Sequence, residues 1–117
     1  MFSWLRSFFH PAIPEPVPPP ATAAEALERW RRAVRPAEQV SALEALAAFG
    51  EAEGKIILQA ALKTAASAHT RIAAARLLAE AGSPGAAFLL REAAKKDAEP
   101  LVRAACENAL KKLDPKT

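Results

Sequence analysis

The sequence has no tyrosine, four glycines and a single cysteine, Cys106. A lone cysteine cannot form an intramolecular disulfide, so a small secreted fold held by disulfides is excluded and the reducing cytoplasm is the expected compartment. The four glycines are scattered and form neither a phosphate-binding loop nor a dinucleotide-binding fingerprint. No apolar run reaches the length of about 18 residues that a transmembrane helix needs.

Charges of both signs are mixed along the chain. Sixteen basic and 13 acidic residues give a net charge of +3. Mixed charges are typical of a solvated helical surface, whereas a nucleic-acid-binding face gathers lysine and arginine, so nucleic-acid binding is not favoured. The length of 117 residues fits one domain, and the abundance of alanine favours an all-α fold.

Proline divides the chain into segments of different character. Six of the ten prolines fall between Pro11 and Pro20, a composition that favours extended polyproline II. We therefore expect an apolar arm at 1–10, a linker at 11–20, a helical body at 21–114 and a tail at 115–117. The arm lacks a basic segment before its apolar residues and is too short for a signal peptide or a membrane span.

The body consists of three consecutive 32-residue blocks, 19–50, 51–82 and 83–114, that align without a gap. Small residues fall on small residues in this alignment, as in the column of Ala42, Ala74 and Cys106. A helical hairpin of this size cannot bury its own apolar faces, so the blocks must stack on one another.

Helix signals recur with the same period. Thr22 and Glu25 form a capping box, and Gly50 and Gly82 share one column as helix stops. The pair at 83–84, Ser-Pro, predicts an N-cap followed by a first-turn proline. Together these signals predict six helices, at about 22–34, 36–49, 52–67, 69–81, 83–96 and 99–113. The expected fold is a short all-α solenoid of three helical hairpins in two layers.

The third block carries a resemblance to a known family. The stretch at 97–110, DAEPLVRAACENAL, resembles the second-helix signature of HEAT repeats in the short form common in bacterial proteins. Arg71 and Arg103 match the arginine of that signature, and Asp97 matches its acidic partner, whereas the first block has Gln39 at the arginine position. The resemblance implies that these groups form structural hydrogen bonds within and between hairpins, and it implies a habit of binding proteins.

The second helix of each hairpin offers a candidate binding surface. Residues three and four apart in the fourth helix, from His69 through Ala73 to Glu80, form one stripe facing away from the apolar positions. The resemblance implies that this layer lines a concave face, and an ordinary solvated surface is the alternative. The candidate residues are Ser41, Glu44, His69, Arg76, Glu80, Asn108 and Lys112.

Catalytic and metal chemistry find no support in the sequence. Cys106 shares its column with two alanines, so we expect a core residue and not a nucleophile. Neither His10 nor His69 has a cysteine or carboxylate at ligand spacing, so no metal and no cofactor are expected. Trp30 lies among arginines, which would suit base stacking, but its column with Leu62 favours a cover over the end of the core.

The arm is amphipathic if helical, because its apolar residues lie opposite Ser3, Arg6 and Ser7. Burying each large apolar side chain contributes about 1.5–3 kcal/mol, and ordering each residue costs about 1–2 kcal/mol, so the arm alone should bind weakly. It needs a shaped groove or a second contact through the repeats. The candidate anchors are Phe2, Trp4, Leu5, Phe8 and Phe9.

These observations favour a non-enzymatic protein–protein interaction adaptor, or an accessory subunit of a larger complex, that docks through the arm and presents a HEAT-like surface. The main alternative is a peripheral membrane protein whose arm lies in the lipid interface. A lyase or nucleic-acid-binding protein built on HEAT-like repeats would need more repeats and a polar or acidic centre, and the sequence predicts neither.

Overall fold

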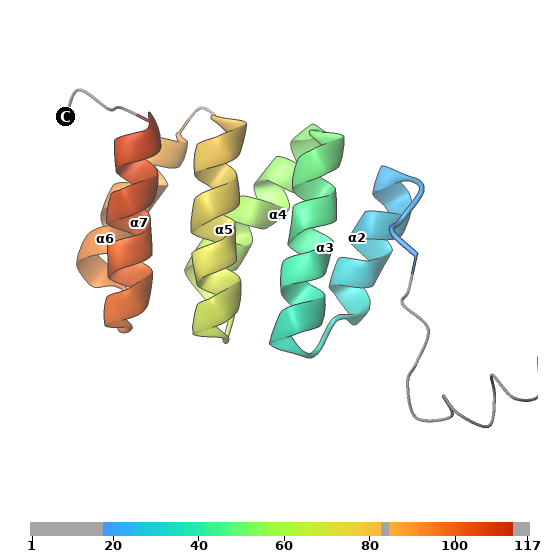
Figure 1. Cartoon of the computed structure of the whole chain (residues 1–117), viewed down its shortest axis with the longest axis horizontal. Coiled ribbons are helices and arrows are strands. Elements are labelled where there is room, and N and C mark those ends of the chain that lie inside the picture. The colour runs from blue at the N-terminus through green and yellow to red at the C-terminus, as the bar shows by residue number, and fades with distance from the viewer. Residues whose placement is uncertain (1–17, 83–84, 114–117) are drawn as a thin grey trace, which may run out of the picture.

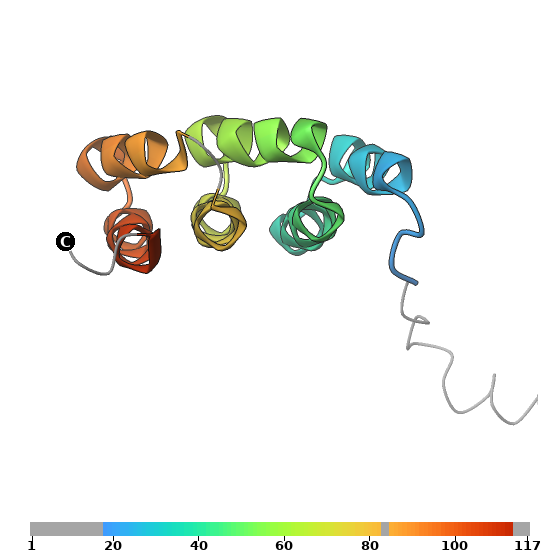
Figure 2. The ribbon, with the colours of Figure 1, turned by 90° about the horizontal axis from the view of Figure 1, so that it is seen from above.

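The computed structural model describes residues 18–82 and 85–113. This part of the chain contains three helical hairpins (Figure 1). Their helices are α2 (Ala23–Arg32), α3 (Pro36–Phe49), α4 (Ala52–Thr64), α5 (Ala68–Ala81), α6 (Ala86–Lys96) and α7 (Pro100–Leu113). Figure 2 shows two layers, in which α2, α4 and α6 run across α3, α5 and α7. The predicted all-α solenoid of three hairpins is confirmed.

The helix ends repeat with the period of the sequence. The second helices begin at Pro36, Ala68 and Pro100, 32 residues apart. Proline suits this position because the first residue of a helix needs no intrahelical N–H bond. Gly50 and Gly82 end α3 and α5 with left-handed φ angles of 68° and 62°, which a residue without a Cβ adopts at no steric cost.

The predicted capping of α2 is present in modified form. Thr22 Oγ1 accepts a hydrogen bond from the backbone N–H of Glu25 at 3.1 Å. The Glu25 carboxylate accepts from the N–H of Ala21 at 2.9 Å, one residue before the helix cap. Both donors would otherwise lack an intrahelical partner, so the two bonds fix the start of α2.

Three boundaries in the layer of first helices differ by two or three residues from the approximate predicted positions. The helix α6 begins at Ala86, and its N-cap is Gly85, which has a left-handed φ of 82°. The cap and first-turn proline predicted at 83–84 lie outside the described residues. The helices α2 and α4 end at Arg32 and Thr64, short of the predicted 34 and 67. In both cases the next residue is extended, with ψ of 126° and 133°, which stops the helical path.

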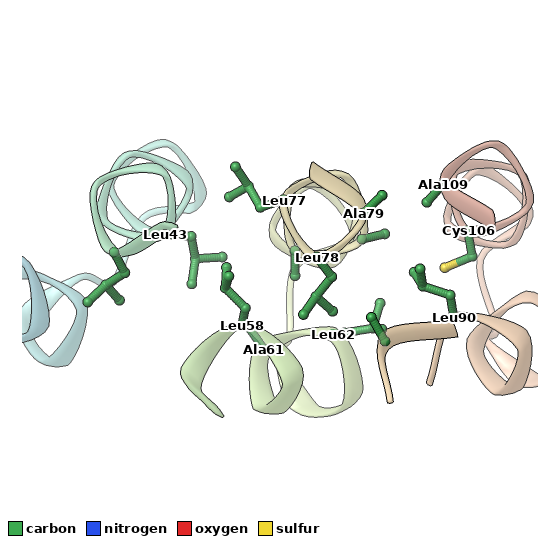
Figure 3. Packing of buried hydrophobic residues seen from close by; sticks show 14 of the residues in the cluster. Leu43, Leu58, Ala61, Leu62, Leu77, Leu78, Ala79, Leu90, Cys106 and Ala109 are labelled. Atoms are coloured by element: carbon green, nitrogen blue, oxygen red, sulfur yellow. The ribbon is translucent and has the colours of Figure 1, made fainter. Parts of the chain in front are cut away.

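The core lies between the two layers and runs through all three hairpins (Figure 3). Its largest members are leucines from both layers, and each contributes about 1.5–3 kcal/mol on burial. The fully buried ones include Leu43, Leu58, Leu62, Leu78 and Leu90. Ala42, Ala74 and Cys106 are all buried as predicted from their shared column, at 3%, 0% and 0% exposure.

One glycine serves close packing between hairpins. Gly54 lies inside α4, where glycine is otherwise unfavourable. A Cβ atom at this position would lie 3.1 Å from the carbonyl oxygen of Leu46. The absence of a side chain therefore lets α4 approach the backbone of α3.

Candidate functional site

A charged cluster lies on the outer face of the second-helix layer, which comprises α3, α5 and α7 and is called the second-helix face below. Arg76 of α5 forms ion pairs with Glu44 of α3 and with Glu80 of its own helix, each with an N···O distance of 3.4 Å. The side chains are 41–52% exposed. Exposed pairs contribute only about 0–1 kcal/mol, so exchanging them for contacts with another molecule costs little.

The other residues predicted for this face are more scattered. His69 is exposed at the start of α5, and Asn108 and Lys112 are exposed on α7. Ser41 is exposed too, and together with Glu44 it lines a groove between α2 and α3. Ala73 was predicted to belong to the exposed stripe and is instead 5% exposed, because α5 packs between α3 and α7 and only a narrow strip of it reaches solvent.

A second polar site links the second hairpin to the third. Arg71 of α5 donates from Nε and Nη2 to the two carboxylate oxygens of Asp97, at 2.9 and 3.2 Å. Its Nη1 donates to the carbonyl oxygens of Ala65 and Ala66. The Arg71 and Asp97 side chains are 14% and 9% exposed. A bidentate pair of this kind is strong and directional, so it fixes the hairpins relative to each other.

Asp97 is held in its charged form by several donors. Burial alone would raise the pKa of its carboxyl group, but the backbone N–H of Glu99 and the Arg71 guanidinium outweigh that effect and lower the pKa below its usual range. Arg103 donates from Nη1 to the carbonyl oxygen of Asp97 at 2.7 Å. The two arginines and Asp97 therefore meet at the turn between α6 and α7.

The junction between the first two hairpins uses a neutral pair instead. Thr70 is fully buried, and its Oγ1 donates to Gln39 Oε1 at 2.8 Å. Gln39 stands in the column of Arg71, so the residue that departs from the arginine pattern still connects two hairpins. Sequence reasoning missed Thr70. The signal was its column, which holds the apolar Val102 in the third hairpin.

A family model of HEAT repeats matches residues 23–111. The chain belongs to the HEAT-repeat family. HEAT repeats commonly mediate protein–protein interactions. Neither a search of curated proteins nor a search of solved structures found a match.

The predicted anchors of the arm, Phe2, Trp4, Leu5, Phe8 and Phe9, lie outside the described residues, as does most of the linker. The HEAT repeats that follow contain no helix long and apolar enough to span a bilayer, in the part of the chain that the structure describes. Within residues 18–82 and 85–113, no group of three His, Cys, Asp or Glu side chains is placed to hold a metal ion.

The thiol of Cys106 is poorly suited to nucleophilic chemistry. It is fully buried in the packed second helices of the HEAT repeats. Burial, followed by the nearby charges of Asp97 and Glu107, raises its pKa to about 11. Because only the thiolate attacks, a protonated and inaccessible thiol has little reactivity.

Trp30 and its arginines occupy the first HEAT repeat. The indole is partly buried and packs against the core, as predicted for a cover over the end of the solenoid. Arg32 and Arg31 pair with Glu28 at 3.1 and 3.7 Å. The two arginines share the single carboxylate of Glu28, which offsets one of the clustered positive charges on the surface of α2 and weakens the case for a phosphate-binding patch.

Proposed function

We propose that this HEAT-repeat protein is a non-enzymatic adaptor or accessory subunit that binds another protein through two contacts. The observation that carries the proposal is the Glu44–Arg76–Glu80 cluster at the middle of the exposed second-helix face. Charged groups at defined positions on an exposed surface confer specificity for a partner with the opposite arrangement. The family habit of binding proteins supports this assignment.

The aromatic arm supplies the second contact. Trp4 and Phe8 are four residues apart and would share one face of a helix. Aromatic residues are the commonest anchors of protein interfaces, because they bury a large area with few rotatable bonds. The arm and the second-helix face are joined by the proline-rich linker, so one partner can engage both and gain from avidity.

Charge reversal tests the contribution of the second-helix face. Tagged full-length Arg76→Glu should lose the partners that the wild-type chain captures, because three carboxylates would then repel an acidic group on the partner. Arg91→Glu is the matched control, since Arg91 is exposed on α6 in the opposite layer. Equal capture by both variants, with unchanged helical melting, would remove the second-helix face from the proposed function.

The alternative function is a peripheral membrane protein anchored by the arm, which the combination of aromatic residues with Arg6 would also suit. In that case binding would require lipid and no protein partner. Measuring partner capture and vesicle binding on the same variants decides between these functions.

A further inference from the structure

The C-terminal end of the solenoid is closed to another helix. In Figure 3, Leu77 of α5 points toward α3 and Ala79 points toward α7. Lys111 lies 32 positions after Ala79, and Glu107 lies 32 positions after the buried Ala75. Both are exposed on α7. Burying these charges under a further helix would be costly, so this side of α7 is a poor packing surface for another helix.

The N-terminal end is open. In Figure 3, Ala109 of α7 points toward α5, and Cys106 lies on the core side of α7 beside Leu90. The residues 64 positions earlier in the sequence are Ala45 and Ala42 of α3. Both alanines line a groove of about 810 Å³ between α3 and the C-terminal half of α2, on the side of α3 away from α5. In the repeating arrangement, this is the position of the second helix of a preceding repeat.

The groove is suited to bulky apolar side chains. Its floor and α3 wall are formed by small residues, including Ala33, Ala37 and Ser41 in addition to the two alanines. Four charged residues also line the groove, Arg29, Arg32, Glu38 and Glu44, so an occupant must leave their charged ends in contact with water. A helix with large apolar residues on one face would fill the space that small residues leave, as in packed cores.

The chain outside the described residues begins at this groove. Pro19 and Pro20 line it, so the preceding 17 residues leave from its edge. Residues 10–17 span at most about 25 Å as polyproline II, and α3 is about 21 Å long, so the arm can reach any point along the groove. Five of these eight residues are not proline, which leaves places where the chain can turn back.

The arm also has a suitable residue spacing. Three residues of α3 that face α5 follow one another at intervals of four residues. Three apolar residues of the arm have the same interval. The α3 residues are Gln39, Leu43 and Ala47, and the arm residues are Met1, Leu5 and Phe9. A helical arm would therefore present to α3 a row of apolar residues at the spacing that α3 uses toward α5.

We propose that the arm at residues 1–9 packs as a helix into the groove on α3 of the same chain and takes the place of the second helix of a preceding repeat. The aromatic anchors are then covered when no partner is present, and a partner that binds the arm must first displace it from α3. This inference concerns the isolated chain and does not depend on the proposed function.

Paramagnetic relaxation enhancement on the full-length chain tests the docking. A spin label is attached at Ser7→Cys in a Cys106→Ala background. We expect the amide signals of Ala37, Ser41 and Ala45 to lose most of their intensity in a dilute sample, while those of Glu107 and Lys111 keep theirs. A sample that mixes spin-labelled chains with isotope-labelled chains carrying no spin label should show no loss, because the contact is intramolecular.

Groove variants give the matched comparison. Ser41→Lys places a long charged side chain in the groove and should restore the lost signals. Ala48→Lys, on the same helix but outside the groove, should leave the loss unchanged. Full signal intensity on α3 in the spin-labelled chain that carries no groove substitution would overturn the proposal. Signal loss in the mixed sample alone would also overturn it, since the arm would then occupy a second copy.

Discussion

Arg71 and Asp97 form a two-bond ion pair, at 2.9 and 3.2 Å, that joins α5 to the turn after α6. The corresponding position in the first hairpin, Gln39, accepts a hydrogen bond from Thr70 of α5 at 2.8 Å. Each junction between HEAT repeats therefore contains a polar connection beside the apolar core. Directional bonds of this kind fix the register of helices that small apolar side chains alone would allow to slide.

Removing the carboxylate of Asp97 should destabilise the fold. Asp97→Ala leaves the largely buried Arg71 guanidinium without its counter-charge, and we expect a loss of about 2–3 kcal/mol, since Arg71 keeps its bonds to two carbonyl oxygens. Urea unfolding measures this change. Glu92→Ala, which breaks an exposed pair with Lys96 on α6, is the control and should have no measurable effect. Similar losses in the two variants would contradict the assigned role of Asp97.

The same pair predicts a pH dependence. The pKa of Asp97 is lowered in the folded state, so its contribution to stability is complete above the unfolded-state pKa of about 4 and is lost as the pH falls through the lower folded-state value. The urea midpoint of the wild type should therefore fall more steeply below pH 4 than that of Asp97→Asn. Parallel pH profiles for the two proteins would show that Asp97 is not the group responsible.

Much of the fold could be predicted from the 32-residue period, because residues in one column meet equivalent surroundings. The period placed the ends of α3, α5 and α7 correctly at Phe49, Ala81 and Leu113. The local Ser-Pro pattern at 83–84 predicted a slightly earlier start for α6 than Ala86, which follows the left-handed Gly85. Local signals of similar strength compete there, and only the packed structure selects between them.

The candidate site was less predictable. Glu44 and Arg76, both predicted for the candidate surface, are 32 residues apart and form an ion pair. The burial of Ala73 and the bond from Thr70 to Gln39 depend on how closely adjacent helices approach. That distance is set by side chains on both helices together, so no single column reveals it.

Replacing Cys106 should have little effect. Alanine fills the equivalent positions 42 and 74, so Cys106→Ala should cost at most about 1 kcal/mol and leave partner binding intact. Native Cys106 should react with a thiol reagent only after unfolding, since it is buried and its pKa is raised to about 11. Rapid labelling of the native protein at neutral pH would show that the site opens.

The HEAT repeats should fold without the arm. The buried core extends from Ala26 to Ala109 and lies within the described residues. A chain that begins at Ala21 should therefore keep a cooperative helical melt by circular dichroism. Its melting temperature should fall only slightly, by the small contribution of a docked arm. A chain without a cooperative transition would mean that the arm is part of the folding unit.

Binding by the arm is the central claim, and partner pull-down beside vesicle co-sedimentation tests it most directly. Trp4→Ala/Phe8→Ala should lose at least about 2 kcal/mol, or thirtyfold in capture, with little change in melting. Ser3→Ala/Ser7→Ala, on the polar side of the arm, should bind as the wild type does. Capture of a protein partner should depend on Trp4 and Phe8, and the wild-type chain should not be recruited to anionic vesicles. Strong vesicle binding by the wild type, with protein capture unaffected by the double substitution, would contradict it and assign the arm to the membrane.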